Sequence, residues 1–216
     1  MRGSEVLYET TLGLTADGSP RHSTALLAEV EGAAAAGGGW DRVGLIAVGR
    51  GPGSFVGIRI GLATARGLAA STGVPAGGIC TLDALGRGMV ERREGANVAV
   101  LDARRGEVFA ALYSSQGERL WEPLALSPEA LAGRLSDLPT PLRAAGSGAV
   151  RFRQELADRD VDIPEDADPV HRVSARHICA LAGIGGYGDG DSLDPIYLRP
   201  PDAQRWRERD TSQRAE

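Results

Sequence analysis

In the first half of the chain, apolar positions switch between the spacing of strands and the spacing of helices. Residues 6–14 alternate apolar and polar side chains, as a half-buried strand does. Residues 23–36 carry apolar side chains at helical spacing, and three glycines end the predicted helix. The continuous apolar run 43–48 predicts a strand buried on both faces. A helix, a strand and a second helix are then expected over 54–71, 76–80 and 81–93.

The second half begins with alternating strands and then turns to helices. Three strands joined by turns are expected over 98–102, 107–113 and 118–121. A helix, a strand and two further helices follow over 127–138, 142–145, 146–158 and 174–182. Strands joined by turns and then alternating with helices predict a mixed sheet flanked by helices, which is an α/β fold.

The change of pattern just before Asn97 suggests a boundary between two lobes. We expect a first lobe over residues 1–95 and a second, smaller lobe over residues 96–200. Residues 201–216 form a polar tail.

The composition and net charge are those of an ordinary globular protein, and they argue against a membrane protein and against a tight nucleic-acid-binding protein. Apolar residues make up 42% and charged residues 25% of the 216, as in ordinary globular proteins, and no apolar run is long enough for a membrane span. We therefore expect a cytoplasmic protein without a membrane segment. The net charge is −5, and only the stretch after Arg199 is locally arginine-rich. This is not the broad positive face that tight nucleic-acid binding requires.

Residues suited to catalysis or metal binding are sparse. Cys80 and Cys179 form no CxxC pair, and the three histidines lack metal-ligand spacing, so we expect no metal site. Asp102 and Glu107 flank a predicted turn and could do acid–base chemistry, but charged hairpin ends are usually only solvated. Ser147 stands in Gly-Ser-Gly, which is not a nucleophile elbow. We assign no catalytic residue.

A glycine turn joins the apolar run at 43–48 to the next helix. Its spacing is G-x-G-x-x-x-G at Gly51, Gly53 and Gly57, which is neither the dinucleotide fingerprint nor a Walker A loop, since the chain contains no lysine. Such turns can cradle phosphate at a helix N-terminus, or they can simply reverse the chain. Gly51 and Gly53 are therefore candidates for residues close to a nucleotide.

The helix after this turn carries small residues on one face. Gly57 and Gly61 are four residues apart and Ala65 is one turn further on, so another backbone can come close. Glycine within a helix costs about 1 kcal/mol relative to alanine, which favours a specific reason for its presence. The neighbour is either a helix of the same domain or a helix of another chain, and spacing alone does not decide between them.

Several stretches, in the same order, resemble the TsaB (YeaZ) family over nearly the whole chain. They are His22-Ser23 before Leu26-Leu27, the segment Gly51-Pro52-Gly53-Ser54-Phe55-Val56-Gly57-Ile58-Arg59-Ile60-Gly61-Leu62-Ala63-Thr64-Ala65-Arg66-Gly67, Pro75 through Thr81-Leu82-Asp83-Ala84-Leu85, Asp102-Ala103-Arg104-Arg105-Gly106-Glu107-Val108-Phe109, and Pro195-Ile196-Tyr197-Leu198-Arg199. The resemblance implies an actin-like (ASKHA, ribonuclease H-like) fold of two related lobes with mixed sheets.

It also implies a role in forming threonylcarbamoyladenosine at position 37 of tRNAs that read ANN codons. In this family a homologous partner, TsaD, performs the transfer, an ATPase, TsaE, joins the complex, and TsaB self-associates without a partner. The resemblance thus implies a non-catalytic scaffold without a cofactor of its own, with ATP or ADP at the interface with TsaD and tRNA reached only through the complex.

The family's partner surface maps onto the first two helices of this chain. The interface residues implied by the resemblance are His22, Leu26, Ser54, Gly57, Ile58, Gly61, Leu62 and Ala65. The competing interpretation is an enzyme: a small actin-like ATPase or phosphotransferase, or a peptidase homologue.

The start of the chain departs from the family's pattern. Family members begin with a strand and turn of the type I-L-A-[IL]-D-T-[ST], whereas here the chain starts at what resembles the end of the second strand, around Glu5 to Leu12. We therefore expect the first strand of the fold to be missing from this sequence, as a misassigned start codon would cause.

Overall fold

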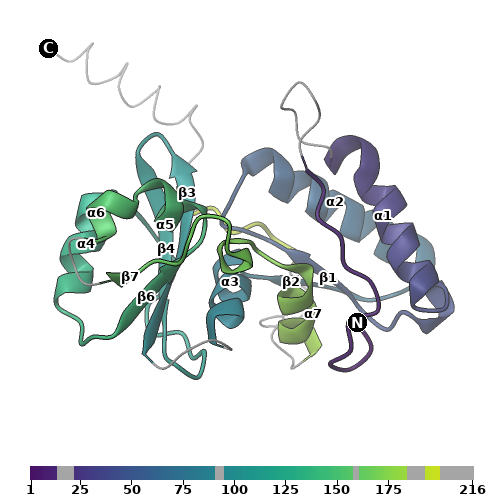
Figure 1. Ribbon diagram of the computed structural model, residues 1–216. Coiled ribbons are helices and arrows are strands. Elements are labelled where there is room, and N and C mark those ends of the chain that lie inside the picture. Colours follow the sequence, from purple (N-terminus) through teal and green to yellow (C-terminus); the bar gives the residue numbers. More distant parts are fainter. Residues whose placement is uncertain (14–21, 91–94, 158–160, 184–192, 200–216) are drawn as a thin grey trace, which may run out of the picture.

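The computed structural model describes residues 1–13, 22–90, 95–157, 161–183 and 193–199 (Figure 1). Helices and strands alternate along most of this length. In chain order the elements are α1 (His22–Ala36), the short 3-10 helix η1 (Trp40–Arg42), β1 (Ile46–Gly49), α2 (Phe55–Thr72), β2 (Ala76–Ile79), α3 (Thr81–Val90), β3 (Ala96–Arg104), β4 (Glu107–Tyr113), β5 (Leu124–Leu126), α4 (Pro128–Ser136), β6 (Leu142–Ala145), α5 (Ser147–Arg151), α6 (Arg153–Ala157), β7 (Val161–Asp162), η2 (Pro169–His171) and α7 (Ala175–Gly183).

The larger sheet forms the second lobe and has the order β5-β4-β3-β6-β7. β3 pairs antiparallel with β4 and parallel with β6, so the sheet is mixed, as the sequence predicts. Alternation along β3 sends successive side chains to opposite faces. Val98 and Val100 pack with α4, α5 and α6, whereas Ala99 and Leu101 face α3. The sheet is therefore covered on both faces, and its core is continuous on each side.

The smaller sheet consists of β1 and β2, paired in parallel from Ile46↔Ala76 to Gly49↔Ile79. A Cβ at Gly61 of α2 would touch Val48, and one at Gly49 would touch Ile178 of α7. Since neighbouring strand residues point to opposite faces, α2 and α7 cover opposite faces of this sheet. In Figure 1 the two sheets lie side by side, with α3 between them.

A C-terminal return segment, residues 193–199, bridges the two sheets. Leu193 lies in the small core of the first lobe, and the Ile196 amide donates to the Arg50 carbonyl at 2.8 Å. Leu198 packs on the α3 side of the larger sheet, and Arg199 donates to the Ala103 carbonyl at 2.9 Å. Contacts between residues more than ninety positions apart in the chain thus hold the lobes together.

The strand predicted over residues 6–14 is wrong for the described part of that range. Residues 1–13 form a strap that pairs with no strand and has only the isolated bridge Arg2↔Glu5. The Tyr8 hydroxyl donates to Glu29 of α1 at 2.5 Å, and Glu9 accepts from the Ser174 hydroxyl just before α7. Residues 1–13 are therefore held by side-chain contacts to α1 and to the start of α7, and not by backbone hydrogen bonds to a neighbouring strand.

Two further predictions need correction. In place of the strand expected over 118–121, the structure has a single isolated bridge between Tyr113 and Arg119. The strand that pairs with β4 is β5, which lies closer to α4 in the sequence. The Leu120 amide still donates to the Leu112 carbonyl of β4 at 2.7 Å, while the Arg119 side chain bonds Asp83 of α3. The helix expected over 146–158 is interrupted at Phe152, whose φ of −111° and ψ of 33° separate α5 from α6.

The strand predicted over 43–48 is present as β1 but is only half-buried at every residue, so burial on both faces was wrong. The predicted lobes describe the two sheets, but α7, expected in the second lobe, packs against β1 and β2 of the first. None of the described helices is both long and apolar enough to span a membrane.

Candidate partner-binding face

Helix α2 starts at a well-capped N-terminus that leaves large side chains exposed. The Ser54 hydroxyl accepts from the Gly57 amide at 3.4 Å, as an N-cap serine does, and Gly73 ends the helix in the left-handed conformation. Phe55 and Val56 occupy the first turn and are 45% and 58% exposed. Large apolar side chains this accessible at a helix start point to a contact surface.

Three side chains at this helix start form one stacked group. The Arg59 guanidinium lies 3.8 Å from the centre of the Phe55 ring. Its Nε donates to the Tyr197 hydroxyl at 3.1 Å, and the Phe55 and Tyr197 ring centres are 5.4 Å apart. We call Phe55, Val56, Arg59 and Tyr197 the aromatic patch. Because each ring and the guanidinium hold one another, the patch is preorganised before any partner arrives.

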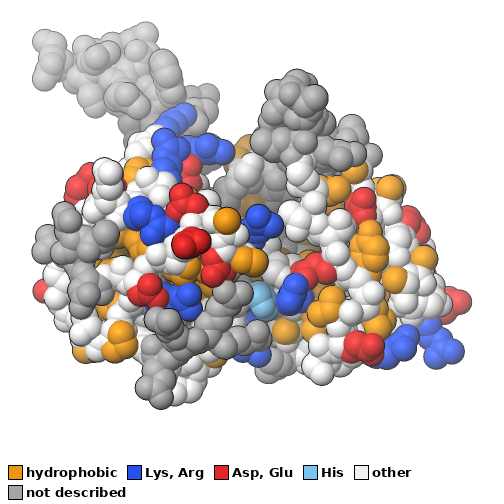
Figure 2. Space-filling model, in the orientation of Figure 1, with side chains coloured by type: hydrophobic (Ala, Val, Ile, Leu, Met, Phe, Trp, Pro, Cys, Tyr) orange, Lys and Arg blue, Asp and Glu red, His pale blue; other side chains and the backbone are white. Residues whose placement is uncertain are grey.

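Helix α1 lies against α2 and adds a further exposed apolar residue. Leu27 is 56% exposed, and Figure 2 shows apolar side chains at the surface over α1. Leu26, the neighbouring position implied by the family resemblance, is half-buried, and the structure does not describe the His22 side chain. On α1, therefore, the accessible apolar position is Leu27.

Half of the interface positions implied by the resemblance lie inside the first lobe. Ile58, Leu62 and Ala65 are 7%, 3% and 3% exposed, and a Cβ at Gly61 would meet Val48 of β1 at 3.5 Å. The face with small residues thus packs on its own sheet, so its neighbour is strand β1 and not one of the two helices expected from the spacing. Ile58, Leu62 and Ala65 are buried in this conformation, and Gly61 is half-buried. Ser54 is exposed and Gly57 is partly exposed, beside the aromatic patch.

Sequence reasoning missed Phe55, Val56, Arg59 and Tyr197 as a group. Two large apolar residues directly after the Ser54 cap were a usable signal, because the first turn of a helix is seldom buried. No local signal joins them to Tyr197, which is 138 residues away from Arg59. Only the return segment brings it there.

The glycine turn is occupied by contacts within the chain. The Gly51 amide donates to Thr81 Oγ1 at 3.1 Å, and the Thr81 amide donates to the Gly51 carbonyl at 2.7 Å. Gly51 has a φ of +103°, and a Cβ there would meet the Ile196 carbonyl oxygen at 2.8 Å. The turn therefore fastens α3 and the return segment, and of the two nucleotide candidates only Gly53 is exposed.

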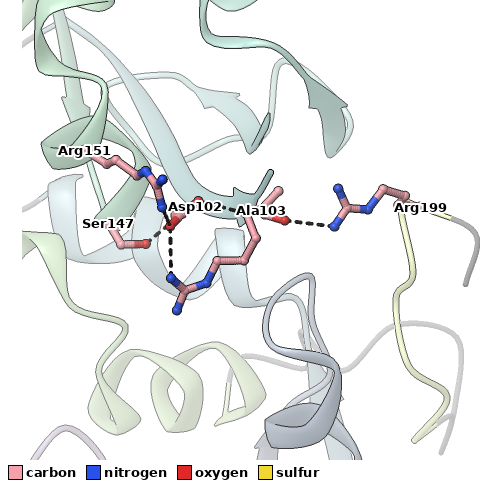
Figure 3. A network of polar contacts seen from close by, with 6 residues as sticks. Asp102, Ala103, Ser147, Arg151 and Arg199 are labelled. Carbon is pink, nitrogen blue, oxygen red and sulfur yellow. Dashed lines mark hydrogen bonds and ion pairs between the residues drawn. The ribbon is translucent and has the colours of Figure 1, made fainter. Parts of the chain in front are cut away.

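The two carboxylates at the β3–β4 hairpin are both held by arginines, and Figure 3 shows the contacts of Asp102. Asp102 pairs with Arg151 at 2.9 Å and accepts from the Arg104 amide at 2.8 Å. Glu107 is bonded by Arg199 from the other end of the chain. Both carboxylates are thus engaged in ion pairs within the chain.

The Tyr113 hydroxyl and the two cysteine thiols are held in their neutral forms. The Tyr113 hydroxyl donates to Asp83 at 2.8 Å, and burial together with that carboxylate holds the pKa of Tyr113 far above its usual value. Burial raises the pKa of the Cys80 and Cys179 thiols, which disfavours reactive thiolates. Among the residues that the structure describes, no three His, Cys, Asp or Glu side chains are grouped to hold a metal.

Comparison with known protein families and solved structures assigns this fold to a class of proteins. A family model for TsaD, tRNA N6-adenosine threonylcarbamoyltransferase, matches residues 16–158. Two solved structures from Pseudomonas aeruginosa superpose with TM-scores of 0.67 and 0.65 at 27% identity. One is described as an uncharacterized protein with similarity to peptidase YeaZ and the other as YeaZ, and the match covers 84% and 82% of this chain and 87% and 85% of theirs. The fold is the two-lobed actin-like fold of that class.

Relatives in sequence narrow the class to one family. The tRNA threonylcarbamoyladenosine biosynthesis protein TsaB of Escherichia coli is 31% identical over 73% of this chain and 71% of its own length. TsaB of Haemophilus influenzae is 38% identical over 74% of this chain and 72% of its own length. An uncharacterized Mycobacterium leprae protein is 41% identical, but only 39% of it is covered. The chain belongs to the TsaB (YeaZ) family and functions in threonylcarbamoyladenosine biosynthesis on tRNA.

Proposed function

We propose that this chain is the non-catalytic scaffold of a threonylcarbamoyltransferase complex and that the aromatic patch, with Leu27, binds the transferase TsaD. The observation that carries the proposal is the stacked Phe55–Arg59–Tyr197 group, exposed at the start of α2. Aromatic and arginine side chains dominate the binding energy of protein interfaces. A preorganised group of this kind loses little side-chain entropy when a partner covers it.

The same face would serve self-association when no partner is present. Covering Val56 and Leu27, each more than half exposed, removes apolar surface from water in either complex. The ATPase TsaE is expected to join the complex. ATP or ADP is expected at the interface with TsaD rather than in a site of this chain alone, because the Gly51 amide is already bonded to Thr81. The site of action is the cytoplasm, and tRNA is bound through the assembled complex.

The test is light-scattering chromatography of the chain mixed with its cognate TsaD, beside a Val56→Asp variant. A carboxylate at this position must be desolvated on docking, so the variant should lose the mixed complex. Leu120→Asp is the matched control, since Leu120 is 54% exposed but lies in the second lobe. It should leave the complex intact. A mixed complex that survives Val56→Asp would overturn the assignment of this face.

Gly61→Leu would be a poor probe of the interface. Because Gly61 faces Val48, a leucine there would overpack the first lobe rather than block a partner. Loss of binding by that variant would not distinguish a damaged fold from a blocked surface. Val56→Asp changes only an exposed side chain, and far-ultraviolet circular dichroism should confirm an unchanged fold.

A further inference from the structure

The end of the β3–β4 hairpin concentrates positive charge in an acidic chain. The net charge of the protein is −5, yet Figure 2 shows arginine side chains gathered over this hairpin end. The four arginines are Arg104 and Arg105 in the hairpin, Arg151 of α5 and Arg199 of the return segment, and the carboxylates among them are Asp102 and Glu107. Guanidinium groups therefore outnumber carboxylates locally, against the balance of the whole molecule.

A nearly buried carboxylate organises two of these arginines. The Asp102 side chain is 12% exposed and pairs with Arg151 at 2.9 Å and with Arg104 at 3.6 Å. Its backbone amide donates to Ser147 Oγ at 3.1 Å, which ties the hairpin to the start of α5 (Figure 3). The Arg104 and Arg151 side chains remain 81% and 50% exposed. The network thus holds the Arg104 and Arg151 side chains in place, and both side chains remain at the surface.

The backbone of this hairpin does not suit arginine. Arg104 and Arg105 have φ of 63° and 56°, followed by Gly106 at 76°. The left-handed conformation costs a residue with a Cβ free energy that glycine does not lose, and hairpin turns of this kind prefer Asn-Gly. Two arginines held in this conformation are therefore a reason to look for a function at the turn.

Ion pairing within the chain explains the position of Arg199 but not the exposure of Arg104. Arg199 is 18% exposed and fastens the return segment to Glu107 and to the Ala103 carbonyl, which is a structural role. The pair between Arg104 and Asp102 is long and solvated, and exposed pairs of this kind stabilise a fold very little. The exposed position of Arg104 therefore needs another reason.

We propose that the hairpin end, through Arg104, Arg105 and Arg151, binds the phosphate backbone of the tRNA substrate while the complex holds it. Guanidinium groups match phosphate oxygens in a bidentate manner, and such contacts position RNA without reading its sequence. Three contacts at one edge supplement binding by the assembly and do not amount to an independent RNA-binding domain. The inference rests on the role of the family in tRNA modification and not on which face binds TsaD.

The experiment measures tRNA affinity of the complex of this chain with TsaD at several salt concentrations. Each phosphate contact contributes about 0.9 to the slope of log K against log salt. The double variant R104N/R105N should reduce the slope by about 2. Arg134→Gln is the control, because its guanidinium stacks on Trp121 elsewhere in the second lobe and its loss should not change the slope.

A stability measurement separates this role from a structural one. Asparagine tolerates the left-handed conformation better than arginine, so R104N/R105N should unfold at the same or higher denaturant concentration. A folded variant with weakened tRNA binding supports the proposal. An unchanged salt slope overturns it, and so does a variant that loses TsaD instead of tRNA, because the hairpin would then be a protein contact.

The outcome remains distinguishable from failure of the proposed scaffold role. If the wild-type chain and TsaD do not associate in light scattering, the scaffold proposal fails, and the same titration is carried out on this chain alone. Because the hairpin only supplements binding by the assembly, absence of tRNA binding by the chain alone at low salt would overturn the phosphate contacts as well. Measurable binding whose salt slope falls with R104N/R105N would assign them to the hairpin, and an equal slope would reject them.

Discussion

Strand β1 of the first lobe is less buried than the central strands of the second lobe. In the second lobe, Val98, Val100, Val108 and Ala110 of the central strands are completely buried between helices on both faces. In the first lobe, all four residues of β1 are only half-buried, although the strand is just as apolar. The first-lobe core cluster contains only three buried residues, Ile58, Leu62 and Leu193.

The difference reflects where the covering segments come from. Sheet and helices of the second lobe are mostly consecutive in sequence, from β3 to β7. The first lobe depends on distant segments: the N-terminal strap, α7 and the return segment. Among the described residues, the exposed large apolar side chains all belong to the first lobe or to segments packed on it, except Leu120. One face of the second-lobe sheet is thus covered by segments next to it in sequence and the other by α3 and the return segment. The first lobe is the one that leaves more apolar surface exposed.

The largest expected effect comes from Gly146 in the second lobe. Gly146 has a φ of +117°, and a Cβ there would overlap the Val100 carbonyl oxygen and meet Leu85 at 2.7 Å. Gly146→Ala should therefore destabilise the protein by more than about 4 kcal/mol or prevent folding. Chemical denaturation measures the change.

Gly61→Ala in the first lobe is the contrasting variant. Its Cβ would make an ordinary 3.5 Å contact with Val48, and the gain in helix propensity of about 1 kcal/mol should leave stability equal or higher. If Gly61→Ala proved as damaging as Gly146→Ala, the loose packing inferred for the first lobe would be incorrect.

Leucine truncations compare the two cores directly. Leu131 is fully buried in the second lobe, and Leu131→Ala should cost about 3 to 4 kcal/mol. Leu62 is 3% exposed in the small cluster of the first lobe, where half-buried neighbours can relax or admit water. Leu62→Ala should cost about 2 kcal/mol, at the low end for this substitution. Equal losses in urea denaturation would contradict the comparison.

The smallest effect concerns the strap that joins α1 to α7. Burial opposes ionisation of Glu9, but hydrogen bonds from Ser174 and Arg176 outweigh it and hold the pKa of this carboxyl below its usual 4.5. A depressed pKa in the folded state stabilises the protein above the unfolded pKa. That contribution should be lost as pH falls below about 4.5 through the lower folded pKa.

Because the Arg176 partner is 54% exposed, Glu9→Gln should cost less than about 1 kcal/mol at pH 7. It should also remove part of the loss of stability that occurs as pH falls below about 4.5. Glu5→Gln, at an exposed strap position, is the control and should change neither quantity. Identical pH profiles for wild type and Glu9→Gln would show that the strap does not depend on this carboxylate.

Local sequence determined the helices and the central hairpin. Ser54 and Ser127, the first residues of the helices predicted over 54–71 and 127–138, cap α2 and α4, each accepting from the backbone amide three residues ahead. The alternation over 98–102 and 107–113 correctly predicted β3 and β4. These features depend on neighbours a few residues apart, so the signals for them lie within short windows of sequence. The family resemblance was likewise confirmed by named relatives.

Tertiary structure decided which surfaces are available for function. Helical spacing identified the Gly57–Gly61–Ala65 face, but only the position of β1 shows that Gly61 and Ala65 lie inside the lobe. The strap looked like a strand because alternation does not specify whether a pairing edge is within reach. Tyr197 beside Phe55, and Arg199 beside Glu107, arise from contacts across more than ninety residues. Such contacts depend on how elements pack together, and no short window of sequence contains that information.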